Sequence, residues 1–146
     1  MRGWVERIND VCAGVTFAPP ASEGELERAQ AQLGVSIPTD LRGLLLESNG
    51  CHHPGLHLEL VWSLDRVIED TLRIRRELSQ RGARDRSLVF FADAGNGDQF
   101  AIQIHQTPPV GTSYVVVWDH ETNEIRQVAD NLGEWLEGWL SGTITV

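Results

Sequence analysis

The residues most able to do chemistry lie in short turns between apolar runs of the second half. The stretch "FADAGNGDQFAIQI", Phe91 to Ile104, combines two glycines, Asn96 and two aspartates, a composition that occurs in phosphate-binding and metal-binding loops. A P-loop requires a Lys followed by Ser or Thr and leads into a helix, whereas here an apolar, strand-like run follows. Asn96-Gly97 between two such runs is typical of a tight hairpin turn, which is the interpretation that we favour.

Two turns of the expected sheet carry carboxylates. The first displays Asp93 and Asp98, and the later segment "WDHETNE" displays three more acids and a histidine. The first turn joins the first and second strands, and the later turn joins the third and fourth. Because neighbouring strands run in opposite directions, we expect these two turns to lie at the same edge of the sheet. Trp118, at the end of its strand, either packs in the core or anchors a partner. The predicted partner-binding residues are Asp93, Asp98, Trp118, Asp119, His120, Glu121 and Glu124.

The segment "CHHPGLH" offers soft metal ligands in Cys51, His52, His53 and His57. Their spacing matches no zinc motif, and no second cluster of Cys or His completes a set, so we predict a polar loop and no metal. Neither cysteine has an evident activating partner, and no serine lies in a G-x-S-x-G turn.

Two further histidines, His105 and His120, are candidate general bases, although each alone is typical of a protein surface. We therefore expect no catalytic set and no cofactor.

The charge of the chain is unevenly distributed. Its 146 residues carry 21 acids and 12 arginines, for a net charge of -9. Residues 1 to 92 hold 13 acids and 11 arginines, a net of -2, whereas residues 93 to 146 hold 8 acids and only Arg126, a net of -7. Such a surface repels nucleic acid and anionic lipid and attracts basic proteins. With no signal peptide or membrane span in the sequence, we expect a cytoplasmic protein.

Hydrophobic periodicity predicts helices in the first half. Helices are expected over residues 2–12, from Ser22 to Gly34 with Ser22 and Glu25 at capping-box spacing, and from Pro38 to a left-handed stop at Asn49-Gly50. A strand is expected over 56–60, and a longer helix from Ser63 to about Arg81.

The second half changes to strand-like periodicity. The runs "LVFFA", "QFAIQI", "SYVVVWD" and "EIRQVA" predict a four-stranded antiparallel meander. Asp130 is expected to cap a closing helix whose buried stripe includes Trp135 and Trp139. The fold class is therefore α+β: one domain over residues 1–146, with N-terminal helices, a sheet in the second half and a closing C-terminal helix.

Taken in order, "IPTDLRGLLLESNG", "FFADAGNGDQFAIQI" and "VVVWDHETNEIRQVADNLGEWLEGWL" resemble the SUKH superfamily, which includes the cell-wall-assembly regulator homologues. The resemblance covers roughly residues 22 to 140. The positions that fall on the family pattern are Pro38, Asn49, Gly50, Gly97, Asp98, Trp118, Asp119, His120 and Glu121. The "CHHPGLH" loop and the arginine-rich helix lie where members vary.

The resemblance implies an α+β domain without catalytic activity. In bacteria such domains most often act as immunity proteins that neutralise a polymorphic toxin, and eukaryotic relatives are regulatory scaffolds. We therefore expect a cytosolic immunity protein that binds a toxin domain, such as a basic nuclease. The alternatives are a regulatory or scaffold module with a nontoxic partner and, third, a small hydrolase that uses His and Asp at the sheet edge.

Overall fold

The computed structural model describes residues 3–55, 59–80, 88–104 and 113–146. The fold is α+β, as the sequence predicts, with helices first, a meander in the second half and a helix at the end. The elements are α1 (Trp4–Val11), β1 (Thr16–Phe17), α2 (Glu23–Leu33), α3 (Thr39–Glu47), β2 (Cys51–His52), β3 (Glu59–Val61), α4 (Leu64–Gln80), β4 (Leu88–Asp93), β5 (Gln99–Ile104), β6 (Ser113–Trp118), β7 (Ile125–Ala129) and α5 (Leu132–Ser141).

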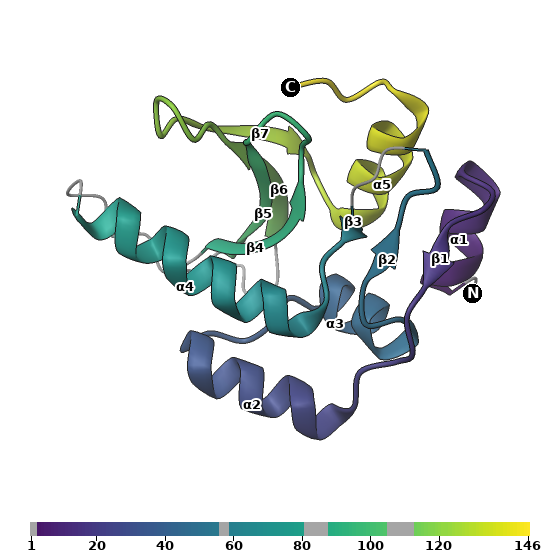
Figure 1. Ribbon diagram of the computed structural model, residues 1–146, viewed down its shortest axis with the longest axis horizontal. Helices are drawn as coiled ribbons and strands as arrows, with labels where there is room; N and C mark the ends of the chain where they lie inside the picture. Colours follow the sequence, from purple (N-terminus) through teal and green to yellow (C-terminus); the bar gives the residue numbers. More distant parts are fainter. Residues whose placement is uncertain (1–2, 56–58, 81–87, 105–112) are drawn as a thin grey trace.

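The larger sheet is the predicted meander, with strand order β4-β5-β6-β7 and every neighbour antiparallel (Figure 1). The smaller sheet joins β1, β2 and β3. A hydrogen bond from the Trp62 amide to the Phe91 carbonyl, 2.8 Å long, links the end of β3 to β4. Strand β4 is therefore covered on its outer side, whereas β7 is an edge strand whose first residues are exposed.

Helices α4 and α5 pack on the larger sheet from different sides (Figure 1). Thr71 on α4 donates to the Phe90 carbonyl and accepts from the Phe90 amide, which fixes the helix against β4. On α5, the buried ring of Trp135 packs edge-on against Phe91 and Phe100, with ring centroids 4.8 and 5.2 Å apart. The prediction that Trp135 belongs to the core is confirmed, and Trp139 is partly buried beside it.

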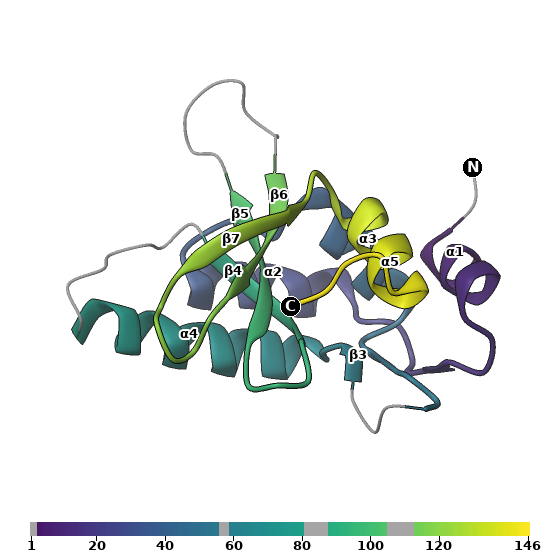
Figure 2. The same cartoon turned by 90° about the horizontal axis from the view of Figure 1, so that it is seen from above.

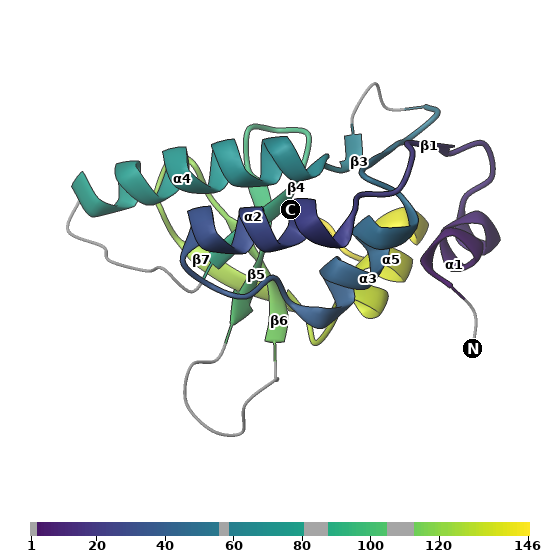
Figure 3. The same cartoon turned by 90° about the horizontal axis from the view of Figure 1, so that it is seen from below.

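Helix α2 lies alongside α4 on the side away from the sheet (Figure 3). Its predicted capping box is present, because Ser22 accepts from the Glu25 amide while Glu25 accepts from the Ser22 amide. Gly34 ends the helix in the left-handed conformation, also as predicted. None of the helices in the described ranges is long and apolar enough to cross a bilayer.

The Asn49-Gly50 pair does not stop α3 in the way the sequence predicts. The helix ends at Glu47, and its C-cap Ser48 is extended. Asn49 Oδ1 accepts a 2.7 Å hydrogen bond from the Leu64 amide, so this side chain satisfies a free donor at the start of α4. Gly50 has a φ of +97°, and a Cβ there would lie 2.8 Å from the Ser63 nitrogen. The pair therefore joins the end of α3 to the beginning of α4.

The cap of α5 also differs from the prediction by one residue. Asn131, and not Asp130, accepts the 2.8 Å hydrogen bond from the Glu134 amide. Both side chains are capable of N-capping. Asp130 instead accepts a hydrogen bond from the Gln127 side chain, which holds it toward the end of β7.

Candidate functional site

The turn between β4 and β5 is a hairpin, as predicted, and not a phosphate loop. The Ala94 amide donates to the Asp98 carbonyl over 3.0 Å and closes the turn. The positive φ angles belong to Gly95 and Gly97, at +92° and +94°, and not to Asn96 as its pairing with Gly97 predicts. Asn96 contributes through its side chain, whose Oδ1 accepts from the Asp98 amide.

The turn between β6 and β7 is built around Asp119. Its Oδ1 accepts hydrogen bonds from the Glu121 amide at 2.8 Å and from the Thr122 amide at 3.2 Å. These two amides, the first of them foremost, lower the pKa of Asp119 below its ordinary value. Asn123, at a φ of +64°, completes the reversal toward Glu124.

The two turns meet at the same end of the sheet, as the meander predicts (Figure 2). Asp98 Oδ1 lies 2.7 Å from His120 Nδ1 and also accepts from the His120 amide at 3.2 Å. The hydrogen bond with Asp98 raises the pKa of His120 above its ordinary value. The imidazole rests over Gly97, where a Cβ would lie 2.6 Å from His120 Cε1. The glycine therefore provides both the turn geometry and the space for the ring.

We call Asp98, Asp119, His120, Glu121 and Glu124 the acidic rim. The Asp98 side chain is 15% exposed and His120 is 38% exposed, whereas Glu121 is 80% exposed. His120 is the only basic group that forms a salt bridge with a rim carboxylate within the described ranges. The rim therefore has more carboxylates than basic groups, and Glu121 and Glu124 present their charge to solvent.

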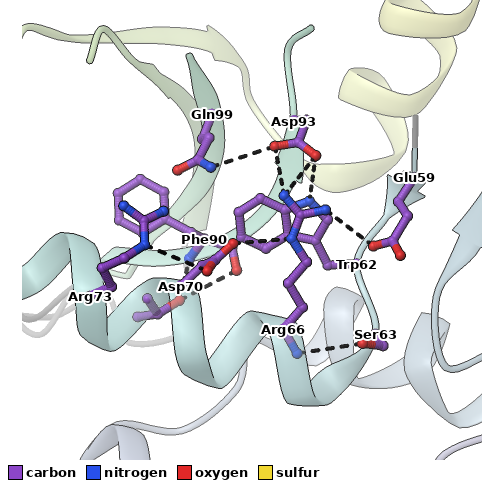
Figure 4. Close-up of polar contacts among 10 residues, drawn as sticks. Glu59, Trp62, Ser63, Arg66, Asp70, Arg73, Phe90, Asp93 and Gln99 are labelled. Carbon is purple, nitrogen blue, oxygen red and sulfur yellow. Dashed lines mark hydrogen bonds and ion pairs between the residues drawn. The ribbon is translucent and has the colours of Figure 1, made fainter. Parts of the chain in front are cut away.

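Asp93 does not join the acidic rim, although the sequence groups it there. Its carboxylate turns toward α4 and accepts from Arg66 Nη2 at 3.0 Å and from Trp62 Nε1 at 3.1 Å (Figure 4). The Arg66 guanidinium also contacts Asp70 at 3.1 Å and Glu59 at 3.3 Å.

The same guanidinium lies over the Trp62 ring, 4.2 Å from its centroid. We call these five residues, Glu59, Trp62, Arg66, Asp70 and Asp93, the Arg66 cluster. It ties β3, α4 and β4 together around one cation. Only the Arg66–Asp70 pair, four residues apart on one helix, has a signal in the sequence.

Trp118 lies beneath the acidic rim. It is 4% exposed and packs edge-on against Phe90, with centroids 5.9 Å apart. Its Nε1 donates to Asn123 Oδ1 at 3.1 Å. The sequence leaves open whether Trp118 packs in the core or anchors a partner, and the structure shows it packed in the core. Its hydrogen bond to Asn123 also holds the β6–β7 turn in place.

The described donors of the "CHHPGLH" segment do not come together in the structure. Cys51 is buried, and burial raises the pKa of its thiol to about 12. His53 Nε2 lies 3.7 Å from Cys12 Sγ, while its Nδ1 accepts from the Gly55 amide. Cys12 is 41 residues away in sequence, so spacing within the segment gives no sign of this pair. His57 and His105 lie outside the described residues.

Comparison with known proteins places the chain in a family. No curated protein matches the sequence. Residues 20–138 match the model of the SMI1 / KNR4 family (SUKH-1), a range that includes the Arg66 cluster, the acidic rim and most of α5. The chain is therefore a member of the SMI1 / KNR4 family (SUKH-1).

Proposed function

We propose that this protein is an immunity protein that binds a basic toxin domain through the acidic rim and blocks it without catalysis. The observation that carries the proposal is the meeting of two turns that place four carboxylates at one end of the sheet, with no arginine paired to them among the described residues. Membership of the SUKH-1 family supports a protein partner.

The rim suits rapid recognition of a basic surface. Its turns are fixed by internal hydrogen bonds, so the charges are held in place before an encounter. A preorganised cluster of one sign raises the rate of association with an oppositely charged partner and disfavours acidic ones. The wider charge pattern acts in the same direction, because residues 93 to 146 carry a net of -7.

Binding fits the rim better than catalysis does. The His120–Asp98 pair resembles part of a general-base arrangement, but no Ser, Thr or Cys side chain among the described residues forms a hydrogen bond with His120. The Cys12–His53 pair lies at the C-cap of α1 and in the loop after β2, away from the turns that form the rim. We propose that the protein acts by occluding the toxin, in the cytosol and without a cofactor.

The proposal is tested by co-expression with the variable C-terminal domain of a toxin encoded beside this gene. We expect the wild-type chain to restore growth and to form an isolable complex. The triple variant Asp98→Asn, Glu121→Gln and Glu124→Gln should protect less well.

A matched control removes the same charges elsewhere. Glu27, Asp65 and Glu69 are exposed on α2 and α4, and Glu27→Gln, Asp65→Asn and Glu69→Gln together should leave protection intact. Failure of the wild-type chain to bind or protect would contradict the immunity function. Equal effects of the two triple variants would place the binding face away from the rim.

A further inference from the structure

We propose that Asp98, Asp119 and His120 form a binding site for a divalent transition-metal ion of the zinc or nickel type. One ligand atom of each side chain lies within 4.8 Å of those of the other two. The set contains an imidazole nitrogen and two carboxylates, which is the donor chemistry that such ions accept in proteins. Calcium and magnesium prefer oxygen donors alone, so the histidine distinguishes this group from an ordinary patch of surface acids.

The spacing is close to that of a formed site. Bonds from zinc to nitrogen or to carboxylate oxygen are about 2.0–2.2 Å long, so ligands of one ion lie up to about 4 Å apart. His120 Nδ1 and Asp98 Oδ1 are already 2.7 Å apart. Asp119 offers a third ligand atom within 4.8 Å of these two, and the ion would take the place of the proton between His120 and Asp98.

Contacts within the two turns hold all three side chains. Asp98 is largely shielded from solvent and anchored to the His120 amide. Asp119 uses Oδ1 to accept two backbone amides, which leaves Oδ2 for a ligand. The imidazole occupies the space over Gly97 that a Cβ would fill. The metal would therefore bridge the β4–β5 turn and the β6–β7 turn with little ordering cost.

The surrounding charge also favours a cation. No arginine among the described residues pairs with the two aspartates, in contrast to Asp93, whose carboxylate is occupied by Arg66. Glu121 Oε1 lies 4.0 Å from His120 Nε2, the ring nitrogen that faces away from Asp98, so Glu121 adds negative charge near the site but is not one of its ligands.

This site is not the one suggested by "CHHPGLH". In that region the described residues bring together two donors, Cys12 and His53, and no third acid, His or Cys completes a metal-sized group. His53 and the exposed His52 are therefore suitable control positions. The metal site shares Asp98, Asp119 and His120 with the proposed binding surface, but metal binding is tested on the isolated protein and needs no toxin.

The test is isothermal titration of zinc chloride and nickel chloride into untagged, chelator-treated protein, with magnesium chloride for comparison. We expect about one transition-metal ion per chain and much weaker binding of magnesium. Asp98→Asn and His120→Gln should each reduce the affinity roughly tenfold or more, the effect usual for disturbing a metal's ligands or their supporting hydrogen bonds. His52→Gln and His53→Gln should bind as the wild type does.

Amide NMR spectra locate the ion and verify folding of each variant. Zinc should shift the signals of residues 97–98 and 119–121 before any others, and the metal-free spectra of the two rim variants should keep the wild-type pattern elsewhere. The proposal is overturned if the wild type shows no binding at millimolar zinc, if binding persists in His120→Gln, or if His53→Gln abolishes it. Shifts centred on Cys12 and His53 would overturn it equally.

Discussion

The acidic rim and the Arg66 cluster use the same residue type in opposite ways. In the cluster, three carboxylates surround one guanidinium that is 33% exposed and packs over Trp62. At the rim, Asp98 and Glu121 contact a single histidine, and Glu121 and Glu124 are exposed to solvent. The cluster depends on the packing of α4 against β3 and β4, whereas the rim is built by two turns of the meander. The carboxylates of the cluster are therefore neutralised by an arginine within the fold, whereas those of the rim have no arginine partner among the described residues.

The largest change in stability should come from removing the guanidinium of the Arg66 cluster. Arg66→Leu removes the cation from Glu59 and Asp93 and leaves Asp70 with its longer, 3.7 Å contact to Arg73. We expect a loss of about 2 kcal/mol in the free energy of unfolding, between the values for exposed and buried ion pairs, because the guanidinium is partly solvated. Urea unfolding of the variant checks this.

Arg66→Lys should lose less stability, since a lysine keeps the charge but not the forked geometry. Glu121→Gln at the rim serves as the control and should leave unfolding unchanged. If Arg66→Leu is as stable as the wild type, the cluster does not have the structural role that separates it from the rim.

A smaller loss of stability is expected on substituting Gly97, which shapes the β4–β5 turn and also makes room for the His120 ring. Gly97→Ala places a residue at a φ of +94° and pushes a Cβ against the His120 ring. Together these should cost about 1–2 kcal/mol of unfolding free energy. In the His120→Ala background only the backbone strain remains, so the same substitution should cost less there. Equal costs in the two backgrounds would show that the ring moves aside freely.

The rim should affect association more than stability. With the proposed toxin partner, we expect Asp98→Asn to lower the association rate constant roughly threefold at low salt, with a difference that shrinks as ionic strength rises. Stopped-flow or surface-binding kinetics at two salt concentrations measure this. Asp93→Asn is the comparison, because the charge of Asp93 is already neutralised by Arg66. This variant should lower the melting temperature and leave the salt dependence of the association rate unchanged. If Asp93→Asn changed the salt dependence of association and Asp98→Asn changed only the melting temperature, the acidic rim and the Arg66 cluster would not differ in the way proposed.

The sequence predicts the rim better than the cluster, for a physical reason. Hairpin turns are set by neighbouring residues, so the common edge of Asp98 and Asp119 follows from strand order alone. The Arg66 cluster depends on how α4 packs across β4. Asp93 belongs to it because it accepts a hydrogen bond from Arg66, 27 positions away in the sequence. Helix ends show the same limit. The local capping box at Ser22 is predictable, whereas the use of Asn49 to cap α4 requires the tertiary structure.

The smallest effect concerns the proton shared within the rim. Because Asp98 raises the pKa of His120, the folded protein binds this proton more tightly than the unfolded chain does. The resulting stabilisation is fully present below the pKa of the unfolded state, about 6.5, and is lost as the pH rises through the higher pKa of the folded state. An NMR titration of the imidazole should therefore give a midpoint above the ordinary value in the wild type and a lower one in Asp98→Asn, with only a slight change in melting temperature because the pair is exposed. An unshifted midpoint in the wild type would mean that solvent screens the pair completely, and the rim would then carry its full negative charge at neutral pH.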